Sequence, residues 1–142
     1  MRTLLILGLI LTAQLANGQN DMLEQYQWEN RLILLFGSIS ESAVEKQITE
    51  LEKDTEGITD RDLLIFHIDR DEVRFIEKSD NPASSADKLR NHYNIGEQEF
   101  RYILIGKDGG VKLNKKEFVA NKDLFSVIDA MPMRQREMRN RK

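Results

Sequence analysis

Three short apolar runs constrain the fold of this chain more than any other feature of its sequence. They cover residues 31–36, 62–69 and 101–106, and each is bounded by charged or turn-forming residues. A continuous apolar run of this length predicts a strand that is buried on both faces. We therefore expect a central sheet with helices packed on each side of it.

Helix signals fill the gaps between the apolar runs. Ser42 and Glu45 have the spacing of a capping box, and they predict a helix that ends near Glu56, with Gly57 just beyond it. Pro82 then breaks the chain, and Ser84 or Ser85 is expected to cap a second helix. The segments between the runs are therefore long enough, and suitably patterned, to cross over the sheet.

The last third of the chain predicts a hairpin followed by a helix. Residues 107–110 read Lys-Asp-Gly-Gly, and Asp-Gly accepts the positive φ angles that a tight hairpin needs. Residues 111–113 alternate in polarity and are expected to return as an antiparallel edge strand. Residues 72–78 predict a further short strand, and Asn121 is expected to cap the last helix.

This order of elements predicts an α/β fold of the thioredoxin-like type. Two βαβ crossovers, a hairpin and a final helix give a mixed central sheet of four to five strands with helices on both faces. A chain of 142 residues provides for one such domain. We place that domain at residues 19–133.

The start of the chain predicts an export signal. Arg2 precedes an apolar run over residues 3–11, and the small residues Ala16 and Gly18 follow, as a signal peptidase site requires. The run is shorter than the roughly 20 residues of a membrane-spanning helix. We therefore expect a signal peptide over residues 1–18 and a periplasmic or secreted protein after its removal.

The chain contains no cysteine. A thioredoxin-like enzyme places its reactive thiol after the first central strand, where the following helix N-terminus lowers the thiol pKa. Here the corresponding residues 37–42 read Gly-Ser-Ile-Ser-Glu-Ser, and a hydroxyl cannot replace a thiolate in disulfide exchange. Thiol oxidoreductase and peroxidase activities are therefore excluded.

The same loop is a candidate site for a different chemistry. Ser38, Ser40 and Ser42, together with Arg101, would line a pocket at a helix N-terminus that accepts an anion or substrate. A serine nucleophile needs a nearby base, and His67 lies inside an apolar run, where a packed and hydrogen-bonded histidine is the commoner situation. We therefore favour the serines as capping and loop residues and expect no catalytic residues among them.

Neither a metal nor a cofactor is expected from the remaining polar groups. Asp60 and Asp62 precede the second apolar run and residues 69–72 follow it, so these acidic groups lie at opposite ends of one strand. They lack the pattern of a calcium loop, and we interpret them as solvated loop charges. Tyr26 and Trp28 are interpreted as core or edge packing.

Residues 134–142 predict a basic C-terminal tail. Its cations are Arg134, Arg136, Arg139, Arg141 and Lys142. They form a candidate contact surface for an acidic protein, anionic lipid headgroups or another polyanion. The alternative is a frayed helix end whose cations complement the helix dipole. Nucleic acid is a poor partner because the remainder of the chain is acidic.

Three motifs carry a resemblance to a known family. They cover residues 26–31, residues 106–113 (Gly-Lys-Asp-Gly-Gly-Val-Lys-Leu) and residues 124–134, which end in Met-Pro-Met-Arg. Together they resemble a family of exported proteins with a domain of unknown function, related to a domain of sushi-repeat-containing and equarin-type extracellular matrix proteins. The resemblance implies a thioredoxin- or peroxiredoxin-like fold and carries no catalytic residues.

The sequence therefore favours a non-catalytic thioredoxin-like binding module that acts outside the cytoplasm on a protein or polyanion. The alternative is an enzyme of a non-thiol class that uses the loop over residues 37–42. A structural envelope protein that self-associates is a third possibility.

Overall fold

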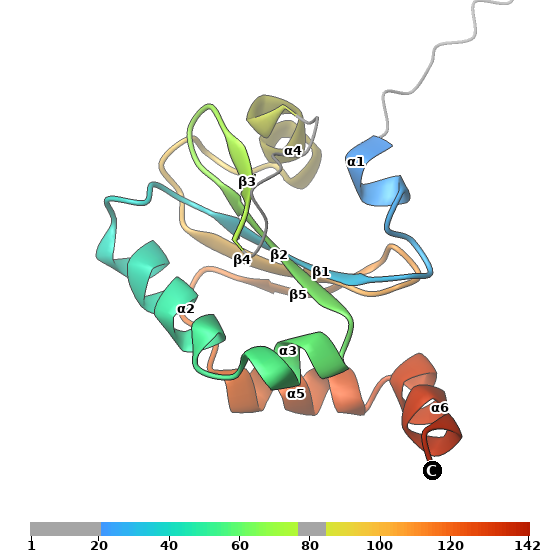
Figure 1. Cartoon of the computed structure of the whole chain (residues 1–142). Helices are drawn as coiled ribbons and strands as arrows, with labels where there is room; N and C mark the ends of the chain where they lie inside the picture. The colour runs from blue at the N-terminus through green and yellow to red at the C-terminus, as the bar shows by residue number, and fades with distance from the viewer. Residues whose placement is uncertain (1–20, 77–84) are drawn as a thin grey trace, which may run out of the picture.

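A five-stranded mixed sheet lies between two layers of helices (Figure 1). The computed structural model describes residues 21–76 and 85–142. The strands are β1 (Arg31–Phe36), β2 (Leu63–Ile68), β3 (Val73–Phe75), β4 (Arg101–Ile105) and β5 (Val111–Lys115). The helices are α1 (Asp21–Glu24), α2 (Ser42–Glu52), α3 (Thr55–Asp60), α4 (Ala86–Tyr93), α5 (Asn121–Asp129) and α6 (Pro132–Asn140). The predicted signal peptide and the break at Pro82 lie outside the described residues.

The strand order is β3-β2-β1-β4-β5, with β1 at the centre. β1 and β2 are parallel and are joined by α2 and α3, so the first predicted βαβ crossover is confirmed. The second crossover is wrong, because β4 pairs with β1 in the antiparallel sense. The short strand predicted within residues 72–78 is β3, and it forms one edge of the sheet.

Alternate residues of β1 enter two separate cores. Leu32, Leu34 and Phe36 face the layer that contains α4, together with residues of that helix. Ile33 and Leu35 face α2, α3 and α5 on the other side. All five side chains are buried, as expected for a central strand covered on both faces. The apolar runs therefore specify the three-layer arrangement seen in Figure 1.

Two of the predicted helix starts differ from the observed ones by one residue. Glu41 is the N-cap of α2 and Ser42 lies inside the helix, so the capping box does not form. Likewise Ala120 is the N-cap of α5, and the backbone N–H of Asn121 donates instead to the carboxylate of Glu50, at 3.0 Å. A tertiary contact has thus replaced local capping at the start of α5.

Other local signals are confirmed or corrected by the structure. Ser85 caps α4 by accepting a hydrogen bond from the Lys88 amide, as predicted. The helix expected to end near Glu56 instead stops at Glu52, and Asp54 caps α3 by accepting a hydrogen bond from the Gly57 amide. The hairpin between β4 and β5 is confirmed, and Gly109 has the expected positive φ, at 82°.

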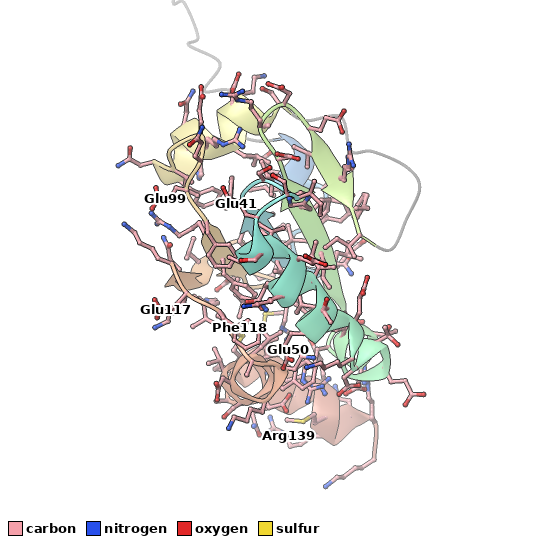
Figure 2. All side chains as sticks on the ribbon, turned by 90° about the vertical axis from the view of Figure 1, so that its left-hand side faces the viewer. Glu41, Glu50, Glu99, Glu117, Phe118 and Arg139 are labelled. Carbon is pink, nitrogen blue, oxygen red and sulfur yellow. The ribbon has the colours of Figure 1, made fainter. Side chains whose placement is uncertain are left out.

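The sheet has two ends, which we name by what lies there. At the loop end, β1 leads into residues 37–42, and Phe36 pairs with Arg101. At the α6 end, Leu32 pairs with Ile105, next to the β4–β5 hairpin and α6. Figure 2 shows Glu41 in the upper half of the molecule and Arg139 of α6 near the bottom. None of the helices in the described part of the chain has the length and apolar character needed to cross a bilayer.

Candidate functional site

The serines of the loop over residues 37–42 contact one another. The hydroxyl oxygens of Ser38 and Ser40 lie 2.9 Å apart, and Ser40 and Ser42 are exposed. His67 is 4% exposed, and its Nε2 lies 2.8 Å from the carbonyl oxygen of Gly37. The histidine is therefore a buried residue that holds the loop backbone, as its structural interpretation predicts. No serine in the described part of the chain forms a hydrogen bond with it.

Arg101 is engaged by neighbours other than the serines. Its guanidinium donates to the Asn114 side chain at 2.8 Å and to the Glu99 carboxylate. The hydrogen bond from Arg101, assisted by one from the Gly96 amide, lowers the pKa of Glu99 to about 2. The structure thus brings Ser38 and Ser40 together, while the described hydrogen bonds of Arg101 lead away from them.

The backbone of the loop is closely packed at its first residue. Gly37 has a φ of 139°, and a Cβ placed there would lie 2.7 Å from Cγ2 of Val44. The carboxylate of Glu41 would lie 3.6 Å from the same Cβ. An acidic side chain thus lies beside the start of α2 and would repel an incoming anion there.

Charged side chains gather at the α6 end of the sheet instead. Ion pairs join nine residues, which we call the ionic cluster: Arg31, Asp60, Arg61, Asp62, Lys107, Asp129, Arg134, Glu137 and Arg141. They come from β1, α3, the start of β2, the hairpin and both C-terminal helices. Five of them are cations and four are carboxylates, so the cluster is nearly neutral and carries one positive charge in excess.

Glu137 joins α6 to the sheet. Its two carboxylate oxygens accept hydrogen bonds from Arg31, each at 3.2 Å, and Lys107 Nζ lies 2.8 Å from one of them. Lys107 also bonds Asp62 at 2.8 Å. Burial would raise the pKa of Glu137, but the bonds from Lys107 and Arg31 outweigh this and lower it. The Glu137 carboxylate is therefore largely buried and is held in its charged form.

Arg134 joins α6 to α3 and α5. It is 2% exposed and donates to Asp60 and, at 3.1 Å, to Asp129. Arg61 bonds Asp129 as well, at 2.7 Å. Burial would raise the pKa of Asp129, but these two guanidinium groups lower it overall. The C-terminal helix is thus fixed to the domain by paired charges.

These contacts correct the prediction of a separate basic tail from residue 134. Residues 134–140 belong to α6, Arg134 is buried, and Arg141 is paired with Asp60. The helical alternative is the one that the structure supports. Arg136, Arg139 and Lys142 are exposed and form no ion pair among the described residues. Only this part of the predicted contact surface is open to a partner.

Sequence reasoning missed the ionic cluster because its members are far apart along the chain. The sequence places Arg31 only at the start of an apolar run. In the structure its side chain is 1% exposed and forms an ion pair with Glu137. Asp60 and Asp62 were interpreted as solvated charges, and each is paired with a cation. The described residues contain no group of three metal-binding side chains. The available signal was that each of the three family motifs contains a member of this cluster: Arg31, Lys107, and Asp129 with Arg134.

The aromatic residues before β1 behave differently from each other. Tyr26 packs against Phe66 and Phe75, with ring centroids 5.6 and 6.1 Å apart, as predicted. Trp28 is 63% exposed and has a φ of 70°, so its interpretation as a packing residue is wrong. Its amide donates to the Lys107 carbonyl, which ties the segment before β1 to the hairpin.

Comparison with known families supports the resemblance to a domain of unknown function. Residues 22–137 match a family model described as a domain of unknown function, DUF4174. The chain belongs to this family. The matched range extends into α6 and includes Glu137. No curated protein matches the chain.

Solved structures with a similar fold are peroxiredoxins. The chain is similar to the reduced 2-Cys peroxiredoxin of Plasmodium vivax, with 14% identity, a TM-score of 0.57, and coverage of 80% of this chain and 83% of that one. It is equally similar to thioredoxin peroxidase I of Plasmodium yoelii, with 14% identity, a TM-score of 0.57, and coverage of 80% and 79%. The α/β thioredoxin-like fold is therefore confirmed.

Proposed function

We propose that this chain is a non-catalytic binding module with a thioredoxin-like fold, and that it acts outside the cytoplasm on a protein or polyanion. The observation that carries the proposal is the composition of the loop over residues 37–42. A peroxidase of this fold needs a thiolate there. This chain has serines and a glutamate in the loop and no cysteine at any position.

The exposed face of α6 is the surface that we propose for the partner. Arg136 and Arg139 are three residues apart on one helix, so their side chains lie on neighbouring positions of its surface. Lys142 follows the helix and is also exposed. Because these cations form no described ion pair, their charge is available to an acidic partner.

Charge reversal tests this surface. The double variant Arg136→Glu, Arg139→Glu is expected to elute from immobilised heparin, a generic polyanion, at lower salt than the unmodified chain. The matched control reverses two exposed lysines, Lys88→Glu and Lys115→Glu, at other places on the domain. Equal elution of the two variants would contradict the assignment of the binding surface to α6.

The proposed location rests on the predicted signal peptide. Removal of residues 1–18 on export would leave Gln19 as the first residue, and intact-mass measurement of the exported protein tests this. The proposed kinship with a domain of sushi-repeat-containing and equarin-type matrix proteins would fit an adhesive role in the same compartment. A full-length protein retained in the cytoplasm would contradict the location without affecting the binding test.

The alternative of a non-thiol enzyme at residues 37–42 gains no support from the site. His67 is bonded to the Gly37 carbonyl rather than to a serine, and Glu41 lies beside the helix start that would attract an anion. A general base within reach of the nucleophile is the first requirement of such an enzyme. We therefore retain the binding module as the proposed function.

A further inference from the structure

A cavity lies on the α4 side of the sheet, where the segment before β1, the end of α4 and the β4–β5 hairpin meet. Its volume is about 200 Å³. A protein cavity of roughly 150 Å³ holds one benzene molecule, so this cavity has room for a single ring with a short substituent. We call it the α1–α4 cavity.

The inner lining of the α1–α4 cavity is apolar. Leu32 of β1 and Ile105 of β4 line it, and these residues pair across the sheet and are each 2% exposed. Leu23, Tyr26 and Tyr93 line it as well, and they pack against the same core. Figure 1 shows α1 and α4 over the same face of the sheet. A lining of this kind favours a ligand with an apolar body.

Two side-chain amides of the lining have free acceptor oxygens. Nδ2 of Asn30 donates to the Asp62 carbonyl oxygen at 3.2 Å, and Nε2 of Gln27 donates to the Asp108 carbonyl oxygen at 2.9 Å. These bonds fix the orientation of both amides. The oxygens Oδ1 of Asn30 and Oε1 of Gln27 have no hydrogen-bond partner among the described residues. Such oxygens select a ligand that carries N–H or O–H donors.

The charge around the α1–α4 cavity is negative. Glu24 and Asp108 line it, and the described lining residues include no lysine or arginine. Asp108 is bonded to Lys112 at 2.9 Å, whereas the exposed Glu24 forms no ion pair in the described part of the chain. Burial raises the pKa of Tyr93 to about 12, so its phenol is neutral. Glu24 is therefore the unpaired charge at this cavity, and it favours a cation.

We propose that the α1–α4 cavity binds a small amine that consists of a ring-sized apolar body and one ammonium group. The body contacts Leu32 and Ile105, and the tyrosine rings also attract the positive charge. The ammonium group donates to the free amide oxygens and is balanced by Glu24. The exposed cations of α6 take no part in this site, so the inference is independent of the proposed function.

Three probes with one ring and different head groups test the proposal. Amide NMR spectra of the chain are recorded during addition of benzylamine, benzyl alcohol or benzoate at constant ionic strength. We expect saturable shifts with benzylamine at Gln27, His92 and Gly109, which represent the three segments that line the cavity. Benzyl alcohol should bind more weakly, and benzoate at least roughly tenfold more weakly than benzylamine.

Two results of these titrations would overturn the proposal. The first is the absence of saturable shifts at the cavity with benzylamine, which would show that the cavity takes no ligand of this class. The second is an affinity for benzoate or benzyl alcohol that equals or exceeds the affinity for benzylamine, which would show that the site does not select a cation.

A matched pair of variants connects the selectivity to the cavity. Glu24→Gln is expected to weaken benzylamine binding about two- to fivefold, the effect of losing an exposed ion pair, and to leave benzyl alcohol binding unchanged. Glu29→Gln is the control, because Glu29 is exposed in the same segment and does not line the cavity. Equal benzylamine affinity of Glu24→Gln and the unmodified chain, or an equal loss for benzyl alcohol, would contradict the role of Glu24.

Failure of this inference is distinguishable from failure of the proposed function. Glu24→Gln is expected to elute from heparin at the same salt as the unmodified chain. The double variant Arg136→Glu, Arg139→Glu is expected to retain benzylamine shifts at Gln27 while it loses affinity for heparin. Loss of those shifts in a folded double variant would mean that the amine does not bind in the α1–α4 cavity.

Discussion

At the loop end of the sheet, Ser38 contacts Ser40 and an ion pair joins Glu99 to Arg101, two residues away in each case, whereas at the α6 end charged side chains meet from segments that lie far apart. Ser38 contacts Ser40, and Gly37 packs against Val44. Glu137, in contrast, contacts Arg31 across most of the length of the chain. The end where this fold usually carries out thiol chemistry is thus locally closed, and the other end is built from long-range ion pairs.

This contrast shows how the polar groups are distributed between the two ends of the sheet. A binding module needs a rigid scaffold that presents a few unsatisfied groups. At the loop end, Ser38 and Ser40 contact each other and Arg101 is paired with Glu99. The α6 end holds three exposed cations, Arg136, Arg139 and Lys142, that form no ion pair among the described residues. The following predictions test whether the two ends differ as this account requires.

The largest effect is expected from Arg31→Met. The substitution removes both hydrogen bonds from Arg31 to Glu137, which keeps its ion pair with Lys107, and hydrogen bonds to a charged group contribute about 1.5–3 kcal/mol each. Chemical denaturation measures the loss. Arg74→Met, which removes an exposed ion pair with Glu72, is the matched control and should cost at most about 1 kcal/mol. Similar losses in both variants would show that the ionic cluster does not stabilise the fold.

Acid is expected to destabilise the α6 end next. The pKa of Asp60 is lowered mainly by its hydrogen bond from Arg134, and the pKa values of Asp129 and Glu137 are lowered against the effect of burial. Their stabilisation is complete above the unfolded pKa, about 4, and is lost as pH falls through the lower folded values.

Denaturation at a series of pH values measures this loss, and Glu137→Gln should reduce its steepness because one of the three groups no longer titrates. A stability that is constant between pH ~5 and pH ~3 would contradict the pairing of these carboxylates.

At the loop end, Gly37→Ala is expected to cost about 1–3 kcal/mol, the range for a strained backbone. A methyl group there would lie 2.7 Å from Val44, at a φ of 139°. Gly96→Ala is the control, because the nearest atom to its Cβ is 3.8 Å away and its φ is not positive. Thermal unfolding compares the two, and equal transitions would show that the loop is not tightly closed.

The smallest effect is expected from Ser38→Ala and Ser40→Ala. Both hydroxyls are at the surface and bond only each other and a local amide, so each change should stay within about 0.5 kcal/mol. Neither variant should alter binding to heparin. A large loss of binding or stability in either variant would instead indicate that the loop over residues 37–42 is a functional site.

The sequence allowed the sheet and the hairpin to be predicted because their signals are local. The apolar run of β1 and the Asp-Gly turn each act within a few residues. Asn121 shows the limit of such signals, since its amide bonds Glu50 and so does not start the helix as a cap. Trp28 shows it too, because a local apolar residue was expected to pack and instead lies exposed.

The candidate site was less predictable than the fold. The five cations of the tail were visible in the sequence, but whether each one is free depends on acids far away along the chain. Arg134 is buried because Asp60 and Asp129 accept hydrogen bonds from its guanidinium group. Arg136 has no such acidic partner among the described residues. Composition therefore identified a basic segment, and only the tertiary arrangement separates its structural cations from those available to a partner.

The central claim is that the chain binds its partner at the α6 end and not at the loop end. The most direct measurement is an amide NMR titration of the chain with a heparin-derived oligosaccharide. The account predicts saturable shifts at Arg136, Arg139 and their neighbours, with residues 37–42 unchanged. Shifts confined to residues 37–42, or no saturable shifts at α6, would contradict it.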